Sequence, residues 1–190
     1  MIASLFLALA APAPAQALVP KDVVLRRFGA CLLKQAPDRA HRLLTSELGS
    51  AVEKALLDEI LSARGEGCID RAVLSMGYGQ IRGAMAQAAF EREPAKLAAA
   101  EALTARAVAR PEAAEGRAFV INYAQCLVAA KPAAAVTLIR SDIASKAESA
   151  AFFGFDDTLK DCMPIGVEYR VNISDVRSHV AAVLYKEAAA

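Results

Sequence analysis

The sequence has no tryptophan and few aromatic residues of any kind. Aromatics make up 6% of the chain although hydrophobic residues make up 56%, so the apolar excess is largely alanine. Alanine favours helix over strand. A chain of 190 residues is long enough for one ordinary domain or two very small ones. We therefore expect an all-α fold in a single compact body.

An excess of charge of either sign is also missing. Lys and Arg number 22 against 21 Asp and Glu, and the charges are interspersed rather than gathered into runs. A nucleic-acid-binding protein needs a concentration of cations to neutralise phosphates. The composition therefore predicts that nucleic acid is not a partner.

Motifs of established chemistry do not occur. The chain has no Gly-x-Ser-x-Gly, His-Glu-x-x-His or P-loop pattern, no cysteine pair at zinc spacing and no Cys-x-x-Cys. The only histidines, His41 and His179, do not match each other in the repeat described below, and we expect both to be solvated on helix surfaces. The sequence thus predicts no catalytic residue, no metal site and no cofactor.

A glycine cluster and an acidic region are also expected to have structural roles. Gly77-Tyr78-Gly79 with Gly83 has the wrong spacing for a dinucleotide loop, and we expect it to relax the turn before a helix. An acidic region lacks the alternating ligand positions of a calcium loop, so we expect a solvated face. Its members are Asp156, Asp157, Asp161 and Glu168.

The N-terminal segment has the pattern of a signal peptide. Residues 1–17 carry no Asp, Glu, Lys or Arg, and an apolar stretch precedes Ala-Pro-Ala-Pro-Ala-Gln-Ala. The usual Lys or Arg ahead of the apolar stretch is missing. We expect cleavage after Ala17, with Ala13 and Ala15 as alternatives, and a periplasmic or secreted protein with no membrane span once the signal is removed.

An internal repeat organises the rest of the chain. At an offset of 95 residues, nine of the 25 positions from 31 to 55 are identical. We therefore expect two tandem pseudo-symmetric units of about four helices, at 18–93 and 112–190, joined by a connecting helix at 94–111 and packed as one body. The matched polar pairs are Ser46 with Ser141, Ser50 with Ser145, Glu53 with Glu148, and Arg82 with Arg177.

Each unit shows helical apolar spacing with proline at a helix boundary. Pro37 and Pro132 are expected to open the second helix of their units, because proline is tolerated in a first turn. A third helix is expected at 51–63, and its partner at 147–160 is interrupted by Gly154. The last helices are expected at 80–92 and 175–186, the second capped by Ser174. Residues 72–76 and 167–171 are weak strand candidates.

Four cysteines in an exported chain predict disulfides. Three pairings are possible, and duplication favours Cys31 with Cys68 and Cys126 with Cys162, because a duplicated unit carries its internal bond with it. The two spacings are 37 and 36 residues. Each unit is therefore expected to be closed by its own disulfide.

The pattern of an aromatic residue, Cys-Leu, proline, Ser-x-x-x-Ser-x-x-Glu, a second cysteine and a final Ile-Arg or Val-Arg helix resembles a group of uncharacterised exported proteins from alphaproteobacteria. Residues 28–44, with Ile81-Arg82-Gly83-Ala84, carry most of the likeness. The resemblance implies an envelope or secreted location and supplies no activity.

The repeated charges are the best candidates for a defined role. Glu53 with Arg82 and Glu148 with Arg177 are expected to form an ion pair within each unit, with exposed independent charges or substrate-binding arginines as alternatives. For function, we expect a non-enzymatic module that binds a protein, a peptide or an envelope component at the seam between the units. The alternatives are an enzyme of unrecognised type at that seam and a purely structural envelope protein.

Overall fold

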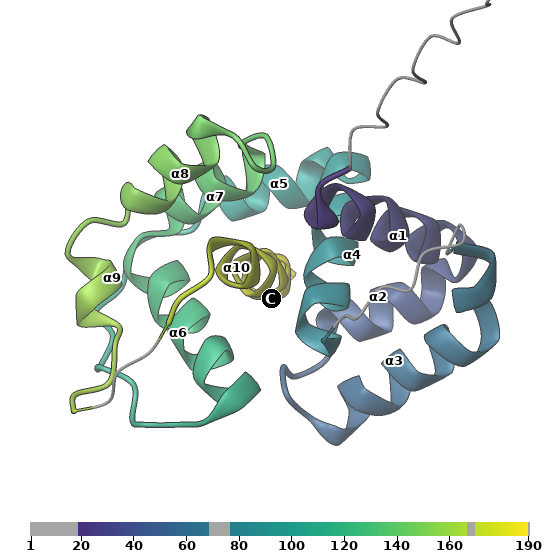
Figure 1. Cartoon of the computed structure of the whole chain (residues 1–190), viewed down its shortest axis with the longest axis horizontal. Coiled ribbons are helices and arrows are strands. Elements are labelled where there is room, and N and C mark those ends of the chain that lie inside the picture. The colour runs from purple at the N-terminus through teal and green to yellow at the C-terminus, as the bar shows by residue number, and fades with distance from the viewer. Residues whose placement is uncertain (1–18, 69–76, 167–169, 190) are drawn as a thin grey trace, which may run out of the picture.

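The computed structural model describes residues 19–68, 77–166 and 170–189, and this part of the chain is helical with no strand (Figure 1). The first strand candidate lies outside the described residues, as do residues 167–169 of the second. The predicted signal peptide also lies outside them. The helices are α1 (Lys21–Gln35), α2 (Pro37–Thr45), α3 (Ala51–Arg64), a short 3-10 helix (Gly65–Cys68), α4 (Tyr78–Arg92), α5 (Pro94–Glu101), α6 (Gly116–Ala130), α7 (Pro132–Arg140), α8 (Lys146–Phe153), α9 (Thr158–Asp161) and α10 (Ile173–Glu187).

Most helix boundaries follow from local sequence signals. Pro37 and Pro132 are the first residues of α2 and α7, as expected for a residue without a backbone N–H. Ser145 caps α8 by accepting a hydrogen bond from the Glu148 backbone N–H at 3.1 Å. The predicted helix at 147–160 is indeed interrupted at Gly154, which separates α8 from α9.

Two boundary predictions are wrong. The connecting helix is only α5, which ends at Glu101, and the chain continues without helix to residue 115. Thr104 and Val108 are β-branched, and Pro111 disfavours helix at the residue before it. Ser174 does not cap α10: Asn172 does, by accepting a hydrogen bond from the Ser174 backbone N–H at 2.9 Å.

One hydrophobic core extends through both units. It includes Leu32 and Leu57 from the first unit and Leu127 and Leu184 from the second, all fully buried. In Figure 1, α10 lies between the α1–α4 group and the α6–α9 group. The two units therefore share their buried surface, as expected for units too small to bury enough surface alone.

Residues that the 95-residue offset matches contact each other where α4 meets α10. The Gln80 side chain donates a hydrogen bond to Asp175, and the rings of Phe90 and Tyr185 meet edge to face at 5.4 Å. A two-fold relation between the units stays a prediction, since these contacts describe only the α4 and α10 pair.

The disulfides join Cys31 to Cys68 and Cys126 to Cys162, which is the predicted pairing. Each bond therefore closes a loop within one unit. Two disulfides are compatible with an oxidising compartment.

No single helix in the described part of the chain is long and apolar enough to span a membrane. Helices α6 and α7 pass such a test only as a pair, and they are bent by 112° where they meet.

Candidate functional site

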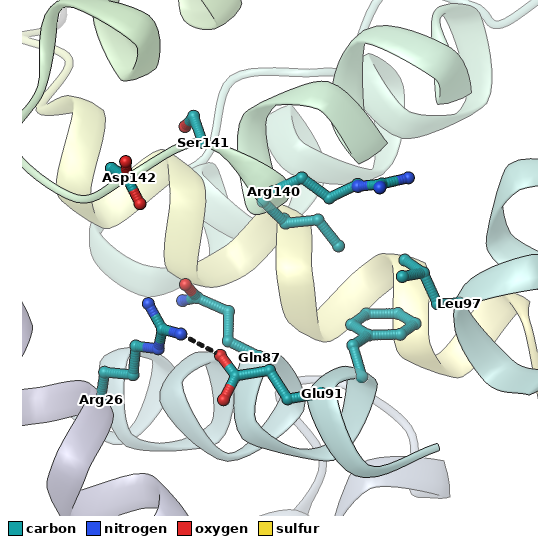
Figure 2. Close-up of a pocket in the computed structure, with 9 residues that line it drawn as sticks. Arg26, Gln87, Glu91, Leu97, Arg140, Ser141 and Asp142 are labelled. Carbon is teal, nitrogen blue, oxygen red and sulfur yellow. Dashed lines mark ion pairs between the residues drawn. The ribbon is translucent and has the colours of Figure 1, made fainter. Parts of the chain in front are cut away.

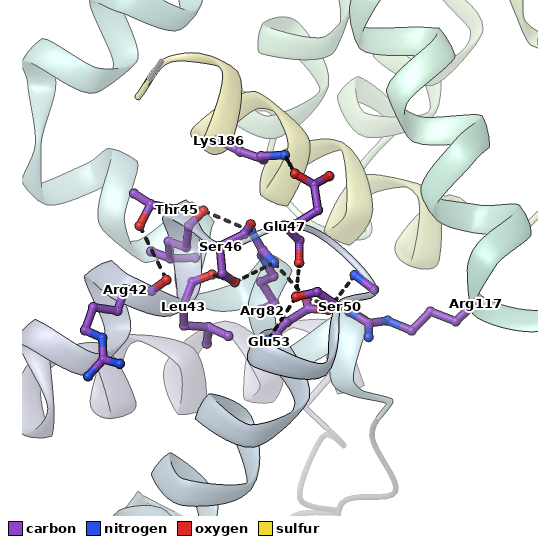
Figure 3. A network of polar contacts seen from close by, with 12 residues as sticks. Arg42, Leu43, Thr45, Ser46, Glu47, Ser50, Glu53, Arg82, Arg117 and Lys186 are labelled. Atoms are coloured by element: carbon purple, nitrogen blue, oxygen red, sulfur yellow. Dashed lines mark hydrogen bonds and ion pairs between the residues drawn. The ribbon is translucent and has the colours of Figure 1, made fainter.

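The predicted ion pair of the first unit is part of a buried arginine clamp on the turn between α2 and α3 (Figure 3). Arg82 of α4 donates from Nη1 to Glu53 Oε1 at 2.8 Å, and both side chains are fully buried. Its Nη2 donates to the carbonyl oxygens of Leu44 at 3.0 Å and Ser46 at 2.8 Å. The guanidinium thus satisfies carbonyl groups that the end of α2 leaves without helical partners.

The second unit builds the same clamp from the matched residues. Arg177 donates from Nη1 to Glu148 Oε1 at 3.0 Å, and from Nη2 to the carbonyl oxygens of Ile139 and Ser141 at 2.9 and 2.8 Å. Ser141 Oγ also accepts a hydrogen bond from Arg177 Nη1. Both repeated pairs are therefore structural, and the guanidiniums are buried rather than free to hold a substrate.

Each clamp also fixes a residue in the left-handed backbone region. Gly49 has φ 76° and Ala144 has φ 57°, and these positions match at the 95-residue offset. The Gly49 backbone N–H donates to Glu53 at 2.7 Å, and the Ala144 backbone N–H donates to Glu148 at 2.8 Å. The glutamates therefore hold the turn as well as the arginine.

A different residue of the opposite unit forms a hydrogen bond to each clamp. Arg117 of α6 donates to Glu53 at 2.7 Å, so this carboxylate binds two guanidiniums. Gln87 of α4 accepts from Arg177 Nε at 2.9 Å. Ala182 stands at the position that matches Gln87, and Arg82 Nε is buried without a hydrogen-bond partner. Sequence matching missed Arg117 and Gln87 because neither is repeated.

Burial and pairing oppose each other at Glu53. Burial raises the pKa of its carboxyl group, but hydrogen bonds from Arg117 and Arg82 outweigh this effect and hold the pKa below its ordinary value. Glu53 is therefore ionised at neutral pH.

Where the α2–α3 turn meets α6 and α10, the boundary between the units is closed. We call this the closed seam. Lys186 of α10 donates a hydrogen bond to Glu47, and Arg117 bridges to Glu53 close by (Figure 3). Ile121 of α6 fills the space beside Gly49, where a Cβ would lie 3.3 Å from its Cδ1. Charged and apolar groups of both units thus meet directly.

At the corresponding boundary on the other side lies a pocket of about 230 Å³. It separates α1, α4 and α5 from α7 and the residues that follow α7, and we call it the open seam (Figure 2). Arg26 pairs with Glu91 on one wall, with side chains 41% and 51% exposed, and Asp142 stands on the opposite wall. The lining residues are Arg26, Gln87, Phe90, Glu91, Leu97, Ile139, Arg140, Ser141 and Asp142.

The pocket continues along α1. An adjoining hollow of about 460 Å³ shares Arg26, Glu91 and Asp142 and adds Val23 and Arg27. The open seam is thus an elongated groove with apolar and charged walls contributed by both units.

The two histidines lie outside this groove. His41 is exposed on α2, as expected. His179 is not solvated: it is 5% exposed, and its Nδ1 lies 2.8 Å from the Asp175 carbonyl oxygen. Gly79 makes room for this ring, since a Cβ there would lie 2.2 Å from His179 Nε2. Gly77 precedes α4 as its N-cap residue, whereas Gly79 and Gly83 lie within α4 and permit close packing on α10. The expectation that the glycines relax a turn is therefore wrong for Gly79 and Gly83.

The acidic region forms exposed ion pairs. Asp156 pairs with Lys131 at 3.0 Å and Asp161 with Arg110 at 3.5 Å, while Asp157 is exposed and Glu168 lies outside the described residues. No group of three or more His, Cys, Asp or Glu side chains in the described ranges is arranged to hold a metal ion.

No family model, curated protein or solved structure matches the chain. The resemblance to exported alphaproteobacterial proteins therefore stays an expectation.

Proposed function

We propose that the protein is a non-enzymatic module of the periplasm or of secreted material, and that it binds a peptide segment of a partner protein in the open seam. The observation that carries this proposal is the contrast between the seams. Lys186 and Glu47 bridge one seam directly, whereas a groove lined by both units separates Glu91 from Asp142 in the other. An elongated groove with apolar walls and a few charged groups suits an extended chain.

The polar groups of the groove favour binding over chemistry. Ser141 is the hydroxyl residue among those that line the 230 Å³ pocket. Its Oγ donates to the Leu138 carbonyl oxygen at 2.7 Å and accepts from Arg177 at 3.0 Å, so the clamp already uses it. A nucleophile needs a base within hydrogen-bonding reach, and Arg177 cannot serve as one. Ser141 is therefore not placed to act as a nucleophile, which weakens the enzyme alternative.

The Arg26–Glu91 pair suits a surface that exchanges partners. Both side chains are about half exposed, and an ion pair of this kind contributes only about 0–1 kcal/mol. A ligand can replace it at small cost. The buried pairs of the clamps differ, because breaking one leaves an uncompensated charge.

Site-specific photocrosslinking in the native host tests the proposal. Leu97, in the wall of the groove, is replaced by p-benzoylphenylalanine, and the control carries the same group at Phe153, which is 64% exposed and lines none of the pockets described above. We expect a discrete adduct with an envelope protein from position 97 and not from position 153. Adducts shared by the two positions, or none from position 97, would contradict the proposal and favour a purely structural role.

A further inference from the structure

The two seams differ at three matched positions. Closed-seam residues Ile121, Lys186 and Glu47 correspond, at the 95-residue offset, to Arg26, Glu91 and Asp142 in the open seam. The closed seam is bridged by the Lys186 ammonium, which pairs with the carboxylate of the other unit. The matching position in the open seam carries a carboxylate instead, and its partner is Arg26 of its own unit.

The different residues at these three positions give the two seams different charges. At the three matched positions, Ile121, Lys186 and Glu47 are together neutral, whereas Arg26, Glu91 and Asp142 carry one net negative charge. Arg140 also lines the 230 Å³ pocket, but it pairs with Glu101, and Arg27 lines only the adjoining hollow. Glu91 and Asp142 both line the two hollows of the groove, so the two carboxylates face the same space. Two carboxylates that face the same groove disfavour its closure, and a cation placed between them is attracted by both.

We propose that the open seam recognises a lysine side chain of the bound peptide, whose ammonium lies between Asp142 and Glu91 as that of Lys186 lies against Glu47 in the closed seam. This inference rests on the proposed function and specifies its ligand. The protein thus supplies the lysine itself at one seam and receives it from a partner at the other.

The remaining walls fit a lysine side chain. Phe90, Leu97 and Ile139 line the 230 Å³ pocket and can cover a four-carbon stem while the ammonium stays at the polar wall. The 230 Å³ pocket taken alone lies below the roughly 300–1,000 Å³ of typical small-molecule sites, and the adjoining hollow of about 460 Å³ leaves room for the peptide backbone. The pocket therefore suits one long side chain rather than a whole small-molecule ligand.

The adjoining hollow favours a peptide over a free cation. Arg27 lines it together with Val23 and Ala30, and Arg26 lies at the boundary of the two hollows. A metal ion or a free polyamine offers these guanidiniums no hydrogen-bond acceptor. A peptide presents carbonyl oxygens next to its lysine, and the same guanidiniums can donate to them.

The test titrates the isotope-labelled, disulfide-bonded protein with a blocked pentapeptide, acetyl-Ala-Ala-Lys-Ala-Ala-amide, and with the same peptide carrying Nε-acetyl-lysine, followed by NMR. We expect the lysine peptide to shift the amide signals of Glu91, Leu97 and Asp142. The acetylated peptide should bind at least tenfold more weakly, because acetylation removes the charge. Equal affinity of the two peptides, or no binding at millimolar concentration, would overturn the inference.

Variants of the full chain give a second, independent readout. R26I/E91K installs the residues of the closed seam, and we expect it to keep its helical content and lose peptide binding at least tenfold. D142N changes only an exposed carboxylate and should weaken binding several-fold. It supplies the readout if the double variant does not fold. The control is E59K, which reverses a half-exposed carboxylate paired with Arg39 outside the groove and should bind normally.

The two proposals fail in distinguishable ways. If position 97 captures a partner but the peptides bind equally, the groove binds peptides without selecting lysine, and only this inference fails. If R26I/E91K retains full peptide binding, the lysine does not occupy the open seam. Loss of both the adduct and the peptide shifts removes the proposed function as well.

Discussion

Gly83 of α4 lies against the backbone of Ser178 of α10, the residue that stands 95 positions later in the chain. A Cβ built on Gly83 would lie 2.1 Å from the Ser178 carbonyl oxygen. Only a residue without a side chain permits this approach. The contacts of Gln80 with Asp175 and of Phe90 with Tyr185, to either side of it, depend on the same close packing.

Gly83→Ala should therefore destabilise the protein by about 1–3 kcal/mol or more, because the added methyl group meets backbone that cannot move aside alone. Urea unfolding followed by circular dichroism measures the change. The control is Gly77→Ala at the start of α4, where a Cβ would contact nothing within 4 Å, and its effect should stay within about 0.5 kcal/mol. Similar losses of unfolding free energy in the two variants would show that the close approach of Gly83 to Ser178 does not limit stability.

The two clamp glutamates should differ in their contribution to stability. Glu53→Gln leaves Arg82 and Arg117 without a counter-charge, and losing a buried partner costs about 3–5 kcal/mol. Glu148→Gln affects one guanidinium, that of Arg177, which also keeps its bond from Nε to Gln87. We expect the smaller loss for Glu148→Gln in chemical unfolding, and the reverse order would contradict the role of Arg117.

Ala144→Gly should stabilise the protein. Ala144 has φ 57°, and a left-handed conformation costs a residue with a side chain about 1–2 kcal/mol. The greater freedom of glycine in the unfolded chain offsets part of this gain, so we expect a net gain of about 0.5–1 kcal/mol. Gly49→Ala is the matched reversal and should lower the melting temperature. A loss of stability in Ala144→Gly would argue against strain at this turn.

Burial of His179 predicts a pH dependence of stability. Burial lowers the pKa of the imidazole, so below about pH 6.5 the unfolded chain binds a proton that the folded protein does not. The free energy of unfolding should therefore fall between pH 7 and pH 5, by at most about 1.4 kcal/mol per pH unit. Glu53, whose pKa is lowered from 4.5, adds its own loss at lower pH.

Equilibrium unfolding at several pH values checks this dependence. His179→Gln should flatten the slope between pH 7 and pH 5, whatever its effect on absolute stability. His41→Gln, at an exposed position on α2, should leave the slope unchanged. An unchanged slope in His179→Gln would mean that another group titrates.

The parts of the structure that could be predicted depend on local signals or on duplication. Pro37 and Pro132 begin their helices because proline suits a first turn. The pairing of Cys31 with Cys68 could be predicted because duplication of a unit also copies a disulfide that lies inside it. The connecting helix is shorter than its alanine content predicts, because β-branched residues and Pro111 disfavour helix in its second half.

The sequence by itself determined the helical class, most helix boundaries, the disulfide partners and the two clamp ion pairs, because periodicity, capping and repetition act within one unit. Only the tertiary structure decided which faces of the units meet. It buried His179 and brought Arg117 to Glu53. It also left a groove beside Asp142, whereas Glu47, at the matched position of the other seam, meets Lys186. These outcomes depend on positions where the units differ, and contacts between distant segments determine whether such a difference closes a seam or opens it.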